Sequence, residues 1–196
     1  MNLIHEMKDF FDKLAPYWGP NSGESNERDK IIELADIKPN SVIADIGCGK
    51  GVMIPHLLST DPHEIIGVDV STEMIRFAEL EWLDLRVSFI AGDILKTELP
   101  PLDVAMIYNA YPHFLDKTAL SEKLFSSLNE NGTVIIAHSR SKEKINGIHK
   151  EGIATCLSIK LKTPLEEYES FKEQFTLELY EDSEKLYFIK LKKKHN

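Results

Sequence analysis

The chain has 196 residues, which fits one domain with a full hydrophobic core. Hydrophobic residues make up 42% and charged residues 28%, a composition that argues against a disordered chain. The 32 acidic residues outnumber the 23 Lys and Arg residues, giving a net charge of −9. Because nucleic-acid binders usually carry a basic face, this charge argues against a nucleic-acid partner.

Cysteine usage and hydropathy narrow the protein class further. Cys48 and Cys156 are the two cysteines, and they form no C-x-x-C pair, so we expect neither a structural zinc site nor a disulfide framework. We find no apolar run of membrane-spanning length, and charged residues interrupt the first ten positions. We therefore predict a soluble, cytoplasmic protein with one domain over residues 1–196 and no membrane span. The oligomeric state is not predicted.

The N-terminal part is predicted to hold two helices. Apolar residues recur at helical spacing over residues 2–14, which indicates an amphipathic helix. A proline-rich break with Tyr17 and Trp18 and a polar loop follow, and a second helix is predicted near 26–36. The two aromatic residues suit either a hydrophobic plug under the loop or a lid over a ligand site.

The most informative stretch is VIADIGCGKG, at residues 42–51. A β-branched apolar run ends in Asp45 and leads into three alternating glycines. Residues 52–58 then have apolar side chains at helical spacing, with Pro55 in the first turn, where it is tolerated. The pattern predicts a strand, a tight loop and a helix, which is how α/β proteins build a nucleotide-type pocket.

Buried strands and helices alternate after this loop. Strands are predicted at 64–71, 86–94 (with its turn), 102–108 and 133–137, and helices at 72–82 and 116–128. A turn is expected at Asn131-Gly132, before the fifth strand. This alternation predicts a mostly parallel, doubly wound sheet.

The pattern is weaker beyond residue 140. Residues 141–150 suit a short helix, and 152–162 suit an irregular or extended segment. Thr163-Pro164 with two following glutamates predicts a capped helix over 163–174. Two strands, at 175–180 and 185–191, are expected to form an antiparallel hairpin at the edge of the sheet.

Three acids stand at the ends of the first three predicted strands. Asp45 ends the first strand, and Asp69 ends the second, eighteen positions beyond Gly51. That offset is close to the roughly 20 residues at which such folds place a ribose-binding carboxylate, although Asp69 could instead cap the next helix. Asp93 follows the third strand. Because the carboxyl ends of parallel strands meet at one edge, we expect the three acids to share a pocket.

Taken together, the acid followed by G-x-G-x-G at 45–51, Asp69 and Ala-Gly-Asp-Ile at 91–94 resemble the motifs of class I S-adenosylmethionine (SAM) methyltransferases. The resemblance covers residues 27–140 and is greatest to the small type 11 branch. It implies an α/β fold with a Rossmann-like, seven-stranded, mostly parallel sheet, an antiparallel C-terminal strand and helices on both faces. In the dinucleotide fingerprint the third glycine comes one residue later, so an NAD-type oxidoreductase is the alternative that this spacing disfavours. A non-catalytic SAM-binding sensor or partner subunit is another alternative.

The resemblance also implies roles for individual residues. Asp69 would bind the ribose hydroxyls, Asp93 the adenine amino group, and Ile94 would pack on the adenine ring. The predicted SAM-binding set is Asp45, Gly47, Cys48, Gly49, Gly51, Asp69, Val70, Met74, Gly92, Asp93, Ile94 and Asn109. The implied organisation is an N-terminal helix and candidate lid (1–26), a SAM-binding core (27–140), an acceptor-side region (141–175) and a C-terminal hairpin (176–196).

Candidate acceptor and catalytic residues follow the fourth and fifth strands. Imidazole titrates in the range that suits a general base, so His113 is the first candidate for proton removal and His138 the second. Either ring could instead be structural, and His113, His138 and His149 together could bind a metal. No carboxylate or cysteine stands at a fixed spacing from them, so no metal is predicted. The predicted acceptor contacts are Tyr17, Trp18, Tyr111, Phe114, Arg140 and His149.

The acceptor class follows from one further comparison of motifs. Asn-Ala-Tyr-Pro at 109–112 departs from the Asn-Pro-Pro-Tyr signature of amino-methylating DNA, RNA and protein methyltransferases. Together with the acidic net charge, this favours transfer of the SAM methyl group to a small molecule. The acceptor and the methylated atom stay open.

Overall fold

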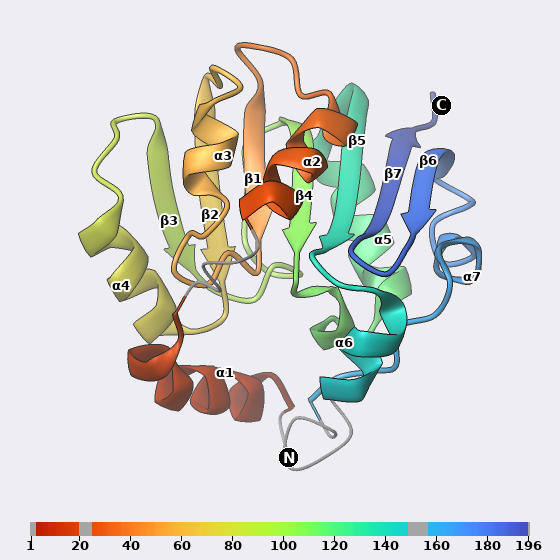
Figure 1. The fold of residues 1–196 in the computed structure, drawn as a ribbon. Helices are drawn as coiled ribbons and strands as arrows, with labels where there is room; N and C mark the ends of the chain where they lie inside the picture. Colours follow the sequence, from red (N-terminus) through yellow and green to blue (C-terminus); the bar gives the residue numbers. More distant parts are fainter. Residues whose placement is uncertain (1–2, 20–24, 149–156, 196) are drawn as a thin grey trace.

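The computed structural model describes residues 3–19, 25–148 and 157–195. One seven-stranded sheet has the order β3-β2-β1-β4-β5-β7-β6 (Figure 1). Its strands are β1 (Val42–Ile46), β2 (Glu64–Asp69), β3 (Val87–Ala91), β4 (Leu102–Tyr108), β5 (Leu128–His138), β6 (Phe175–Asp182) and β7 (Tyr187–Lys193). Neighbours from β3 to β5 pair in parallel, whereas β7 is antiparallel to both β5 and β6. The predicted fold class, with an antiparallel C-terminal strand, is confirmed.

Helices cover both faces of the sheet (Figure 1). They are α1 (Leu3–Leu14), α2 (Ser25–Ala35), α3 (Ile54–Leu58), α4 (Thr72–Glu81), α5 (Lys117–Ser127), α6 (Lys142–Ile148) and α7 (Pro164–Tyr168), with short 3₁₀ turns at Ala15–Tyr17 and Tyr111–His113. In the part of the chain that the structure describes, no helix is long and apolar enough to cross a membrane.

Strand periodicity explains why the sheet needs cover on both faces. Successive side chains of a strand point to opposite faces. In β1, Ile43 joins one buried cluster with residues of α2 and α3, whereas Ala44 and Ile46 join another with residues of α5. The same alternation runs through the other central strands, so these strands are apolar on both sides, as is typical of buried parallel sheets.

Two local predictions differ from the structure. The helix expected over 163–174 ends at Tyr168, although Thr163 forms the predicted capping box with Glu166. After Tyr168 the chain continues in tight i→i+3 turns, which place Phe171 in the core. The turn expected at Asn131-Gly132 lies inside the long strand β5, where Asn131 takes a φ of 65° and the register with β4 shifts.

Candidate functional site

A cavity of about 610 Å³ opens at the carboxyl ends of the central strands. Its walls come from the ends of β1, β2 and β4, the turn after β3, and the loop between β1 and α3. Helix α1 crosses this edge of the sheet and contributes Leu3, Ile4, Met7 and Phe11 (Figure 1). The size suits a cofactor-sized ligand, and the position is the one at which open α/β sheets bind ligands.

The glycine loop between β1 and α3 has a backbone that other residues rarely adopt. Gly47, Gly49 and Gly51 have φ values of 73°, 54° and 80°. A Cβ on Gly47 would come within 2.5 Å of the Cβ of Ala110, and one on Gly51 within 2.6 Å of Trp82 Nε1. A Cβ on Gly49 would meet nothing within 4 Å. Gly49 therefore has open space beside it, whereas Gly47 and Gly51 are needed for close packing.

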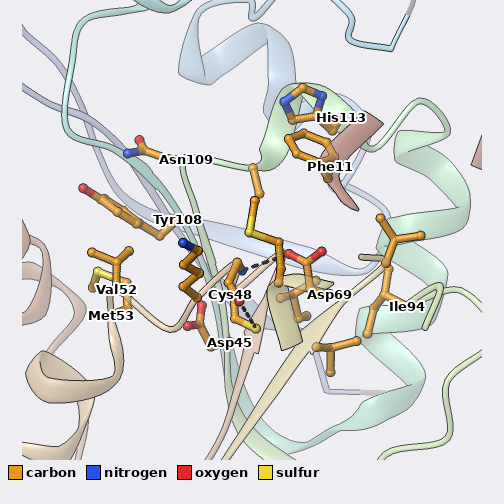
Figure 2. Close-up of a pocket in the computed structure, with 18 of the residues that line it drawn as sticks. Phe11, Asp45, Cys48, Val52, Met53, Asp69, Ile94, Tyr108, Asn109 and His113 are labelled. Atoms are coloured by element: carbon orange, nitrogen blue, oxygen red, sulfur yellow. Dashed lines mark hydrogen bonds between the residues drawn. The ribbon is translucent and has the colours of Figure 1, made fainter. Parts of the chain in front are cut away.

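Asp69 forms the wall of the cavity at the end of β2. Its Oδ2 accepts a hydrogen bond from the Gly49 amide at 2.9 Å (Figure 2). Its Oδ1 accepts one from the Ser71 amide at 2.8 Å. Burial raises the pKa of this carboxyl, and the two amide donors oppose that shift. Each carboxylate oxygen keeps a second lone pair, so Asp69 can still accept a hydrogen bond from a ligand.

Asp45 is the most deeply buried of the three acids, with 1% of its surface exposed. Burial, and then the nearby charge of Asp69, raise the pKa of Asp45 to about 7. In the described part of the chain its Oδ2 is buried without a hydrogen-bond partner. Buried carboxyl oxygens normally have partners, so this position is suited to a donor supplied by a ligand.

Asp93 completes the acidic set. Its Oδ1 accepts a hydrogen bond from the Leu95 amide at 3.1 Å, and Gly92, Asp93 and Ile94 all line the cavity. Each of the three acids comes from the end of a different parallel strand, and the pairing of β1, β2 and β3 brings them into one cavity. Every residue of the predicted SAM-binding set except Gly51 lines this cavity.

Helix α1 is anchored beside the cavity by Asp12. The Asp12 Oδ1 accepts hydrogen bonds from Ser71 Oγ at 2.6 Å and from the Glu73 amide at 3.1 Å. Ser71 is the N-cap of α4, and Glu73 lies in its first turn. Lys8 pairs with the other oxygen of the same carboxylate. A carboxylate at a helix N-terminus is favoured by the unpaired amides and the helix dipole, so Asp12 ties α1 to α4.

His113 lies where α1, the end of β4 and the segment after residue 156 meet. Its Nδ1 is 2.9 Å from the carbonyl oxygen of Leu157, and its ring meets that of Phe11 edge to face, with centroids 5.1 Å apart (Figure 2). The Ile159 amide also donates to the Pro112 carbonyl at 2.9 Å. Because a carbonyl only accepts, the Nδ1 of a neutral His113 carries the proton, and Nε2 has the lone pair.

Comparison with known proteins identifies the kind of domain that this cavity belongs to. Residues 43–132 match the family model described as a methyltransferase domain. The chain is 30% identical over 111 residues to phosphoethanolamine N-methyltransferase 3 of Arabidopsis thaliana, covering 55% of this chain and 23% of that protein. It is 36% identical over 83 residues to a ribosomal RNA small subunit methyltransferase of the same plant, covering 40% and 23%. The chain thus spans about a quarter of the length of these curated relatives.

Among solved structures, the complex of DhpI with S-adenosylhomocysteine (SAH) has a TM-score of 0.77 and 17% identity, covering 97% of each chain. Residues 43–132 therefore match a methyltransferase domain, and the fold of the whole chain is that of this SAH complex. These matches agree with SAM as the predicted cofactor, and the cavity at the strand ends is the candidate site for it.

The predicted catalytic and acceptor-contacting residues separate into two groups. Trp18, His113 and Phe114 line the cavity. Tyr17, Tyr111, His138 and Arg140 are not among its lining residues, and His149 lies outside the described residues. Tyr17 is 86% exposed, whereas the His138 ring is buried against Tyr187, with centroids 5.8 Å apart. The structure therefore does not bring His113 and His138 together in the cavity.

Tyr111 belongs to a buried polar cluster behind the cavity. Its hydroxyl donates to Glu167 Oε2 at 3.0 Å, and Glu167 Oε1 accepts from the Lys162 amide at 2.9 Å. Lys117 donates to the Tyr111 carbonyl and lies 3.2 Å from the centroid of the Tyr111 ring. Burial lowers the pKa of Lys117 to about 7, although the Glu167 charge raises it. The cluster holds the end of β4 against α7.

Several lining residues were missed by the sequence analysis. Arg28, His56 and Trp82 all reach the cavity from helices or their ends. The amphipathic pattern of residues 2–14 signalled a buried face, but it did not indicate that this face would cover a ligand site. Across the residues that can be described, no three His, Cys, Asp or Glu side chains are grouped so that they could hold a metal ion.

Proposed function

We propose that the chain transfers the methyl group of SAM to a small-molecule acceptor. The observation that carries this proposal is the convergence of Asp45, Asp69 and Asp93 on one cavity beside the glycine loop. The buried, unpartnered Oδ2 of Asp45 can accept a hydrogen bond from the ammonium group of SAM. Asp69 can accept from the ribose hydroxyls, and Asp93 with Ile94 can hold the adenine.

His113 is the proposed base. Methyl transfer is an in-line displacement: the acceptor lone pair forms a bond to the methyl carbon, while the carbon–sulfur bond breaks and its electrons stay on sulfur. His113 Nε2 takes the proton that the acceptor loses. Most of the remaining acceleration comes from orienting the two reactants, since effective molarity can remove roughly 7–11 kcal/mol of barrier.

Two features support a small acceptor over a nucleic acid. Helix α1 lies over the cavity with four apolar side chains, and the net charge is −9. A nucleic-acid substrate would need an open, basic approach to the methyl group. One relative is named a phosphoethanolamine N-methyltransferase and another a ribosomal RNA methyltransferase. Because these names cover both a small molecule and an RNA, the test must compare the two classes of acceptor directly.

The experiment incubates the purified chain with methyl-labelled SAM and either a metabolite extract or total RNA. We expect label in a small product that passes a 3 kDa filter and resists nuclease. Nuclease-sensitive label in RNA would contradict the proposed acceptor class. Binding of SAH without any labelled product across many extracts would favour a non-catalytic sensor, and binding of NADH but not SAH would favour the oxidoreductase.

A further inference from the structure

Arg28 is a buried cation in the wall of the cavity. It lies in the first half of α2, is 6% exposed and lines the cavity. Its Nε donates to His56 Nε2 at 3.2 Å, and His56 Nδ1 is 2.7 Å from Asp29 Oδ1. Within the described ranges, His56 is the side chain that Arg28 binds, and this hydrogen bond involves only the Nε group of the guanidinium. No carboxylate of that part of the chain pairs with the guanidinium.

The three side chains have a defined donor order. Asp29 accepts, so His56 Nδ1 carries the proton, and His56 Nε2 has the lone pair that receives the Arg28 Nε–H. A neutral imidazole thus fixes the direction of the guanidinium without cancelling its charge. The two Nη groups remain available as a two-pronged donor, the geometry that binds a carboxylate. A buried charge without a counter-ion is costly, which favours an anion supplied by the ligand.

The position of Arg28 indicates which anion that is. His56 belongs to α3, which begins directly after the glycine loop that follows Asp45, and α2 lies beside α3 (Figure 1). Asp45 and Arg28 line the same cavity, one offering an acceptor and the other a cation. An α-amino acid carries the complementary pair, an ammonium and a carboxylate.

We propose that Asp29, His56 and Arg28 form a carboxylate subsite that holds the amino-acid end of SAM, with Asp29 and His56 as positioning residues. This inference rests on the proposed function. Lys50 is another cation that lines the cavity. We assign the carboxylate to Arg28 rather than to Lys50, because Lys50 is only half-buried and its Nζ lies 4.3 Å from the centroid of the Phe77 ring.

Two probes that differ in the amino-acid end test the subsite. SAH carries the carboxylate, whereas 5′-methylthioadenosine has the same adenosine and sulfur without it. In Arg28→Gln we expect SAH to bind about 10- to 100-fold more weakly and methylthioadenosine to bind as in the wild type. Arg76→Gln is the control, because Arg76 is a half-exposed arginine on α4 that pairs with Glu73 and is not among the cavity-lining residues.

The positioning role has its own test. In His56→Gln the side-chain amide oxygen can still accept from Arg28, whereas His56→Leu keeps the bulk and removes the acceptor. We expect His56→Leu to weaken SAH, but not methylthioadenosine, by about 3- to 10-fold, and His56→Gln to recover most of that loss.

The outcomes separate this inference from the proposed function. Equal weakening of both probes in Arg28→Gln, or no weakening of either, would overturn the carboxylate subsite while leaving SAM as cofactor. Equal SAH affinity in His56→Leu and the wild type would overturn the positioning role. If the wild-type chain binds neither probe, the proposed function fails.

Discussion

The cofactor side and the acceptor side of the cavity are built in different ways. On the cofactor side, Asp45, Asp69 and Asp93 come from the ends of three adjacent parallel strands and reach one cavity. On the acceptor side, His113 and His138 follow the adjacent strands β4 and β5, yet only His113 lines the cavity. Adjacent strand ends are therefore enough to assemble the first side but not the second.

The difference lies in what surrounds each strand end. The three acids follow β1, β2 and β3, which pair with one another and lie with the glycine loop within one stretch of chain, residues 42–93. The end of β4 is instead fixed by α1 and by residues after 156, through Phe11, Leu157 and Glu167. The acceptor side thus depends on contacts between segments that are distant in the sequence.

The largest expected effect is on the acceptor side, at His113. If its Nε2 removes the acceptor proton, His113→Ala should lower turnover by about 10²- to 10⁴-fold. SAH affinity should change by less than about threefold, because the predicted cofactor contacts are the acids. Turnover measured with the acceptor found by labelling, and SAH affinity by calorimetry, check both parts.

His138→Ala is the matched control for His113, since that ring is buried against Tyr187. We expect it to lower the free energy of unfolding with little change in turnover per folded molecule. A larger loss of turnover in His138→Ala than in His113→Ala would reverse the assignment of the base.

The next largest effect is expected on the cofactor side. Asp69→Ala should weaken SAH binding by about 100-fold, because the ribose hydroxyls lose a charged acceptor. Asp103→Ala is the control: this acid also makes two hydrogen bonds, to the Val42 amide and to Asn129, but it is not among the cavity-lining residues. Unchanged SAH affinity in a folded Asp69→Ala protein would contradict the ribose assignment.

The same difference explains how far the sequence could predict this molecule. Strand periodicity and the glycine loop predicted five strands that alternate with helices in a mostly parallel sheet, and the resemblance of the motifs implied the residues of the cofactor side. Gly51 falls outside the lining because Trp82 closes the space beside it, a contact 31 residues away in sequence. Arg28 was missed because a single arginine in an amphipathic helix carries no signal until α3 is placed beside α2.

Tyr111 shows the same limit on the acceptor side. It follows β4 directly, as a cavity residue would, yet its hydroxyl is taken up by Glu167, 56 residues later. Tyr111→Phe should lower the free energy of unfolding by about 1–3 kcal/mol, because Glu167 loses a buried donor. Denaturant unfolding measures this loss, and SAH affinity should stay the same. Tyr180→Phe, at a half-exposed site on β6, should change the unfolding free energy by less than about 0.5 kcal/mol.

The smallest expected effect is the pH dependence that Asp45 gives to the cofactor side. Its pKa is about 7 in the ligand-free fold, against an ordinary value of 3.8. Between these values the folded state holds a proton that the unfolded state has lost, so the stability of the ligand-free protein falls as pH rises from about 4 to about 7. Asp45→Asn should remove the part of this slope that Asp45 contributes, which thermal unfolding of both proteins in a pH series measures.

Cofactor binding should show the opposite trend. Only ionised Asp45 attracts an ammonium group, and its ionised fraction rises about tenfold between pH 6 and pH 8 for a pKa of about 7. SAH affinity should therefore rise by up to about tenfold more in the wild type than in Asp45→Asn over that range. The difference between the two proteins isolates Asp45 from the titration of the ligand itself. Parallel pH profiles would show that Asp45 does not hold the ammonium group, and would leave Asp69 and Asp93 as the acids that define the cofactor side.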